Sequence, residues 1–163
     1  RDPYKTTQKD GSVGVGQSWF NMLYQVLLGE EAAGMRTPEF YSQFGAQSKR
    51  VARELLSFLV SAAHAGTSVA AYGAAAKGNT LLNYAGVRPD LLSFVVDRSP
   101  AKIGKYMPGS HIPIRPVNAL AARRPDYVLI LPWNIASEVM EQNRALRESG
   151  VRFVTAVPAL KVL

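Results

Sequence analysis

Residues 69–84 read Val-Ala-Ala-Tyr-Gly-Ala-Ala-Ala-Lys-Gly-Asn-Thr-Leu-Leu-Asn-Tyr. An apolar run is followed by small residues and then by residues at helical spacing. The pattern predicts a strand over 67–72, a tight turn at Gly73 and a helix over 77–84 that Gly86 ends. Apolar strands joined to helices by short turns build parallel sheets that are buried on both faces.

The same alternation continues toward the C-terminus. We predict strands over 91–96, 127–131 and 152–157, and helices over 117–122 and 135–148, the latter capped by Asn134. Strands separated by helices form right-handed crossovers and pair in parallel. Residues 67–163 are therefore expected to form an α/β core with a Rossmann-like parallel sheet and helices on both faces.

Two helices are predicted before this core. One covers residues 18–33, and the second begins at Pro38 with Thr37 as its N-cap and continues to about residue 65. We expect the helical segment 17–66 to pack on the core, so that the chain forms one domain overall. Residues 1–16 are polar and glycine-rich, which is typical of a linker or arm.

Composition narrows the classes of function. The chain has 163 residues, of which 47% are apolar, and it has no cysteine, so thiolate metal sites and a cysteine nucleophile are excluded. His64 and His111 lack metal-ligand spacing, and we expect no metal. The net charge of +7 is scattered, which favours an anionic small molecule or an acidic partner domain over nucleic acid.

Targeting signals are also missing. No apolar run could span a membrane and no signal-peptide pattern is present, so a cytoplasmic protein is expected. The first residue is Arg1 rather than Met, which predicts a piece of a longer protein.

Ligands of open parallel sheets bind beyond the carboxyl ends of the strands. The strongest candidate there is the turn after residue 72, because free N–H groups at a helix start and the charge of Lys77 favour a phosphate. The turn fits neither the G-x-G-x-x-G fingerprint nor a P-loop, and a turn that binds nothing is the alternative. Its candidate binding residues are Gly73, Ala75, Lys77, Gly78 and Asn79.

Four further residues are weaker candidates. Asp97 ends the second strand, where an acidic residue would bind ribose hydroxyls; it could equally cap a helix or pair with Arg98. Arg98 belongs to a cationic cluster with Lys102 and Lys105, either a phosphate clamp or a solvated surface. His111 lies in a Gly- and Pro-rich loop that could cover the crevice, and Trp133 could stack on a base. No triad or carboxylate pair emerges, so no catalytic residue is assigned.

Four segments, residues 69–84, 96–102, 108–114 and 126–134, together resemble the C-terminal domain of the sugar-nucleotide C-methyltransferase family. The resemblance implies a parent enzyme that methylates a deoxyketosugar carbon. S-adenosylmethionine and the catalytic base would belong to an upstream catalytic domain of the same chain. It also implies that this fragment binds the nucleotide-linked sugar through the nine candidates above and is inactive alone.

Two alternatives remain at this stage. The chain could be a nucleotide- or CoA-binding regulatory module without chemistry. It could also be a structural domain that uses the helix over 38–65 for docking or to form a homodimer. No membrane partner is expected.

Overall fold

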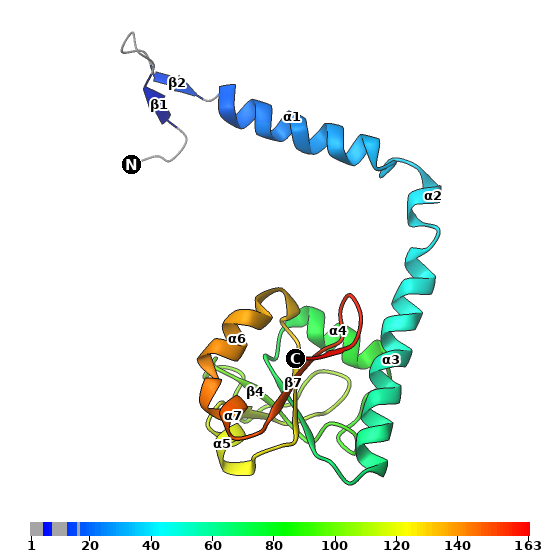
Figure 1. The fold of residues 1–163 in the computed structure, drawn as a ribbon, viewed down its shortest axis with the longest axis vertical. Helices are drawn as coiled ribbons and strands as arrows, with labels where there is room; N and C mark the ends of the chain where they lie inside the picture. Colours follow the sequence, from blue (N-terminus) through cyan, green and yellow to red (C-terminus); the bar gives the residue numbers. More distant parts are fainter. Residues whose placement is uncertain (1–4, 8–12, 16) are drawn as a thin grey trace. The chain divides into compact units, whose positions relative to one another are not determined.

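The computed structural model describes residues 5–7, 13–15 and 17–163 (Figure 1). Its contacts divide the chain into two compact units, residues 1–47 and 48–163. The first unit contains β1 (Lys5–Thr7) and β2 (Val13–Val15), which pair antiparallel, and helix α1 (Gln17–Ala32). Helix α1 confirms the helix expected over 18–33. Residues 1–4, 8–12 and 16 of the expected arm lie outside the described residues.

The long helix expected over 38–65 is interrupted. A short helix α2 (Pro38–Tyr41) is separated from α3 (Phe44–His64) by two residues. The hydroxyl of Ser42 donates to the carbonyl of Glu39 at 2.6 Å, and such a local bond competes with the helical backbone. Thr37 holds the N-cap position, but its hydroxyl donates to the Gly34 carbonyl instead of capping α2.

The second unit is built on a six-stranded sheet in the order β5-β4-β3-β6-β7-β8. Five strands are parallel, which confirms the predicted parallel sheet, and β8 pairs antiparallel with β7. The predicted strands correspond to β3, β4, β6 and β7, whereas the short edge strands β5 and β8 were not predicted. The strands are β3 (Val69–Tyr72), β4 (Val95–Asp97), β5 (Ile114–Pro116), β6 (Tyr127–Ile130), β7 (Arg152–Thr155) and β8 (Lys161–Val162).

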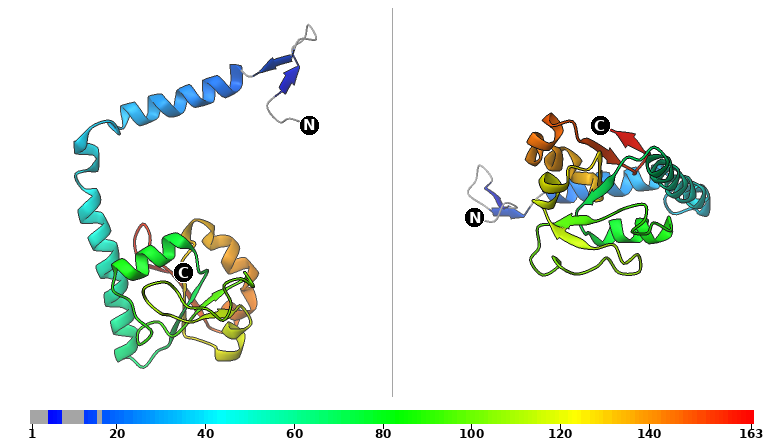
Figure 2. Two further views of the ribbon diagram at one scale, coloured as in Figure 1. Left: turned by 180° about the vertical axis from the view of Figure 1, so that it is seen from behind. Right: turned by 90° about the horizontal axis from the view of Figure 1, so that it is seen from below.

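Helices cover both faces of this sheet (Figures 1 and 2). One face packs against α3 and α4 (Ala76–Tyr84), and Leu55, Leu59 and Leu82 are fully buried there. The other face packs against α5 (Ala119–Arg123) and α6 (Ala136–Gln142), around Phe153 of β7. Burial of each large apolar side chain contributes about 1.5–3 kcal/mol, so these two clusters fix the layers of the fold.

The last predicted helix, over 135–148, is also broken. It consists of the 3₁₀ turn η1 (Trp133–Ile135), α6 and α7 (Arg144–Glu148). Asn143 separates α6 from α7, and its side-chain amide donates to the Val139 carbonyl at 2.7 Å. Asn134 lies inside η1 and makes no capping bond, so its predicted role as an N-cap is wrong.

Candidate functional site

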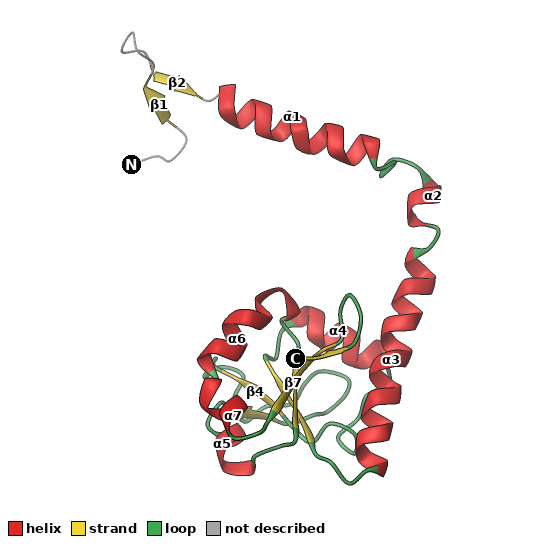
Figure 3. Cartoon of the chain, in the orientation of Figure 1, coloured by secondary structure: helices red, strands yellow, loops and turns green. Residues whose placement is uncertain are grey.

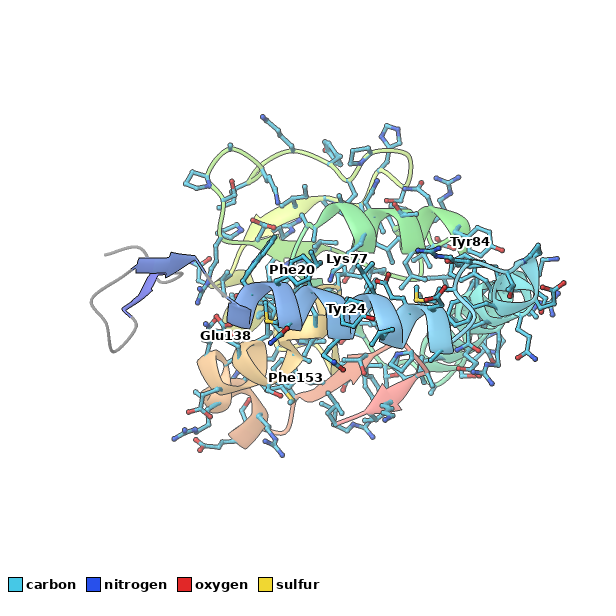
Figure 4. All side chains as sticks on the ribbon, turned by 90° about the horizontal axis from the view of Figure 1, so that it is seen from above. Phe20, Tyr24, Lys77, Tyr84, Glu138 and Phe153 are labelled. Atoms are coloured by element: carbon cyan, nitrogen blue, oxygen red, sulfur yellow. The ribbon has the colours of Figure 1, made fainter. Side chains whose placement is uncertain are left out.

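The carboxyl ends of β3 and β6 mark the point where the strand order reverses. From β3 the chain moves outward to β4 and β5, and it then returns to β6 on the other side of β3. Ligands of doubly wound sheets bind at this position. The turn from β3 into α4 lies here, and Lys77 and Tyr84 stand at opposite ends of α4 (Figure 4).

Two predicted site residues, Gly73 and Gly78, are required by packing. Gly73 has a positive φ of 89°, and a Cβ there would lie 2.7 Å from Cδ of Pro132. A Cβ at Gly78 would lie 2.6 Å from Cβ of Leu131. Both glycines therefore let α4 and the turn approach the end of β6. Contact of either glycine with a ligand stays a prediction.

Asp97 anchors the turn from the neighbouring strand. Its Oδ2 accepts the backbone N–H of Ala74 at 2.7 Å, and its Oδ1 accepts the N–H of Ser99 at 2.8 Å. Lys102 Nζ donates to Ala74 O at 2.9 Å and lies 3.3 Å from Asp97 Oδ2. Asp97 thus pairs with Lys102, and the predicted alternative of a pair with Arg98 is not observed. The Asp97 side chain is 12% exposed, and both of its carboxylate oxygens already accept hydrogen bonds.

Lys77 is held by residues that follow β6. Its ammonium group donates to Asn134 Oδ1 and lies 4.7 Å from the centre of the Trp133 ring. The structure therefore brings together two predicted site residues, Lys77 and Trp133. It also shows that Asn134 orients the lysine. Ala75, the N-cap of α4, has no side chain that could accept the N–H groups of the first turn, and no side-chain cap is present.

An open crevice of about 630 Å³ lies between α4 and the segment 101–108. It is lined on one side by Ala75, Asn79 and Thr80 and on the other by Lys102, Lys105 and Tyr106. We call it the α4 crevice. Its volume falls in the range of small-molecule sites, roughly 300–1,000 Å³. Asn79 Oδ1 is buried and has no hydrogen-bond partner among the described residues.

Lys105 and Tyr106 belong to the long connection between β4 and β5, which contains no helix (Figure 3). Two backbone bonds hold it to β5, from Gly104 N–H to Ile114 O at 3.0 Å and from Ile114 N–H to Lys105 O at 2.8 Å. Lys105 was predicted as part of a cationic cluster, whereas Tyr106 was missed. The sequence feature that could have identified Tyr106 is its position next to a lysine in a Gly- and Pro-rich loop.

Of the nine predicted site residues, only Ala75 and Asn79 line the α4 crevice. Arg98 is exposed and does not line it. His111 does not line it either, but its ring centre lies 6.4 Å from that of Tyr106. His111 adopts a φ of 57°, which is uncommon for a residue with a side chain and often marks functional loops.

A polar cluster also occupies the opposite, amino-terminal edge of the sheet. The backbone N–H and the hydroxyl of Ser68 donate to Asp126 Oδ2 at 2.7 and 2.8 Å. These bonds, above all the one from the backbone, lower the pKa of Asp126. The cluster links the starts of β3 and β6 and lies away from the edge where a ligand is expected. Ser68 and Asp126 can therefore serve as reference positions in ligand-binding experiments.

The fold and the site define a Rossmann-like α/β domain with an open crevice at the carboxyl edge of its sheet. The chain belongs to the C-methyltransferase C-terminal domain family, whose model matches residues 15–158. This confirms the resemblance seen in the sequence.

A curated relative is the C-methyltransferase NovU of Streptomyces niveus. The two sequences are 32% identical over 139 residues, which is 85% of this chain and 33% of NovU. The chain thus spans about a third of that relative's length. Within the described residues, no helix is both long and apolar enough to cross a membrane.

Proposed function

We propose that this chain binds the methyl acceptor of a C-methyltransferase and that the acceptor is a nucleotide-linked deoxyketosugar. In this proposal the acceptor's phosphates lie at the start of α4 beside Lys77. Methyl transfer itself would take place in an upstream catalytic domain, and the chain alone would be inactive. The observation that carries the proposal is Lys77, held at the strand-order reversal of a domain from this family.

The arrangement of Lys77 suits an anion. Trp133 and Asn134 limit the motion of the lysine side chain, so less conformational entropy is lost when a phosphate binds. The N–H groups of the first turn of α4, which no side chain caps, would add further donors for phosphate oxygens. A charged ammonium group and backbone donors at one place favour a phosphate over a neutral ligand.

S-adenosylmethionine, the expected methyl donor of the parent enzyme, fits this domain poorly. A Rossmann-type site for an adenosine ligand uses a free carboxylate at the end of the second strand to bind ribose hydroxyls. The carboxylate at that position, Asp97, already accepts from Ala74, Ser99 and Lys102. The same argument weakens NAD as a ligand in the alternative of a nucleotide- or CoA-binding regulatory module. We therefore assign the donor to the upstream domain and derive no step through it.

Calorimetric titration of the 163-residue chain tests the proposal. We expect binding of dTDP and of a dTDP-linked ketosugar, and no binding of NAD or S-adenosylmethionine. Substitution Lys77→Ala should weaken dTDP binding roughly tenfold, because a charge-assisted hydrogen bond is lost. Lys161→Ala, an exposed lysine on β8, is the matched control and should leave the affinity unchanged. Tight binding of NAD, or the absence of dTDP binding, would contradict the proposal.

A further inference from the structure

We propose that the α4 crevice binds the nucleoside diphosphate part of the acceptor. In this assignment Tyr106 is the platform for the base and Lys105 is a second cation for the diphosphate. The inference rests on the proposed function, because it locates one part of the same acceptor. It adds residues from the β4–β5 connection to a site that otherwise consists of α4 and the end of β6.

Lys105 differs from the other lysine of the α4 crevice in having no ion-pair partner among the described residues. Lys102 also lines it, but its ammonium is paired with Asp97, and two of its three hydrogens go to Asp97 and Ala74 O. Within the described part of the chain, no carboxylate lies within ion-pair distance of Lys105. Lys102 therefore acts as a positioning residue that fixes the turn, while Lys105 supplies the uncompensated positive charge.

The remaining walls suit a flat ring. Tyr106 is 62% exposed, and Met107, Pro108 and Ile114 line the α4 crevice beside it. A phenol ring left in solvent at the mouth of a crevice can stack on a base, and such stacking is sequence-tolerant because every base has a π-face. The backbone bonds from Gly104 and Ile114 hold the connection around Lys105 in place, so the backbone beside Tyr106 is fixed.

Asn79 gives the α4 crevice its polar specificity. Its Oδ1 is buried without a partner among the described residues, and a buried acceptor left unpaired costs about 1–3 kcal/mol. Because Asn79 lines the α4 crevice, a rotation of its side chain would offer this oxygen to a ligand N–H or O–H. A nucleoside carries such donors on its base and its ribose, whereas inorganic diphosphate at neutral pH mainly accepts hydrogen bonds. This side chain therefore favours a nucleoside diphosphate over a bare anion.

Because of Lys77, the assignment can be tested separately from the proposed function. It does not line the α4 crevice and is held instead by Trp133 and Asn134, after β6. Substitutions at Lys105 or Tyr106 leave the Lys77 contacts in place. Binding that depends on Lys77 alone can therefore be told apart from binding that also uses the α4 crevice.

Calorimetric titration of the chain with dTDP and with inorganic pyrophosphate tests the assignment. Tyr106→Ala should weaken dTDP at least about fivefold and leave pyrophosphate unchanged, because only the base loses its stacking partner. Tyr106→Phe should bind dTDP as the wild type does. Lys105→Ala should weaken both ligands roughly tenfold, since both lose a charge-assisted contact.

Matched controls exclude general effects. Tyr84 is 56% exposed at the far end of α4, and Tyr84→Ala should bind both ligands normally (Figure 4). Lys161→Ala is the control for the lost charge, and circular dichroism melts verify that each variant folds. Unchanged dTDP affinity in Tyr106→Ala or in Lys105→Ala overturns the assignment, and the proposed function stands if Lys77→Ala still weakens binding. Absence of dTDP binding to the wild type overturns both.

Discussion

At the scale of single residues, the glycines of the chain differ in what a methyl group would meet. A Cβ at Gly78 would lie 2.6 Å from Cβ of Leu131, a distance that real Cβ atoms do not tolerate. Gly45 also lies in a helix, and a Cβ there would meet no atom within 4 Å. The first glycine allows a helix to touch a strand, whereas the second has no such role.

We expect Gly78→Ala to lower the free energy of unfolding by about 1–3 kcal/mol, because the added methyl forces α4 away from β6. Gly45→Ala should raise it by roughly 0.5–1 kcal/mol, because alanine is the better helix former. Urea unfolding followed by circular dichroism measures both. Equal effects of the two substitutions would contradict the close packing of α4 on β6.

At the scale of elements, the turn between β3 and α4 depends on β4. Asp97 at the end of β4 accepts the N–H of Ala74, which is only 8% exposed. Lys102 completes the link by donating to both Ala74 O and Asp97. The start of α4, on which the candidate site depends, is therefore held by a neighbouring strand and the loop after it.

Removal of this link should destabilise the chain. Asp97→Ala leaves the buried N–H of Ala74 without an acceptor, and we expect a loss of about 1–3 kcal/mol in the free energy of unfolding. Asp90→Ala, at an exposed aspartate, is the control and should change it by less than about 0.5 kcal/mol. Urea denaturation of both variants measures the difference. If Asp97→Ala unfolded at the same urea concentration as the wild type, the bond to Ala74 would contribute nothing to stability.

Sequence reasoning predicted those elements whose signal is local and repeated. The strand over 69–72 and the helix that follows it were found, because an apolar run and helical spacing meet at Gly73. The helix breaks at Ser42 and Asn143 were missed, because each coincides with a single side-chain bond to a backbone carbonyl, which hydrophobic periodicity does not report. The edge strands β5 and β8 were missed because they are short and depend on their neighbours for pairing.

The candidate site was predicted only in part, because some of its residues lie in an irregular loop. Lys77 and Trp133 were named from their positions at strand ends, which the order of elements determines. The choice of Lys102 rather than Arg98 as the partner of Asp97 depends on the path of the loop after β4. The position of Tyr106 at the α4 crevice depends on the path of the same loop. Side-chain pairing within irregular segments follows from tertiary structure, which periodicity does not predict.

At the scale of the whole molecule, the two ends of the strands carry different groups. The carboxyl edge of the sheet carries Lys77, the α4 crevice and the buried acceptor of Asn79. The amino edge carries the Ser68–Asp126 cluster, whose hydrogen bonds are made within the protein. Acceptor binding is therefore expected at one edge only.

Two-dimensional NMR of the ¹⁵N-labelled chain, titrated with a dTDP-linked ketosugar, tests this central claim most directly. The account predicts saturable shifts of backbone signals over residues 73–80 and 101–107. It predicts unchanged signals at the amino edge, at Ser68 and Asp126. Shifts confined to the amino edge, or no shifts at millimolar ligand, would contradict the claim that this domain holds the acceptor.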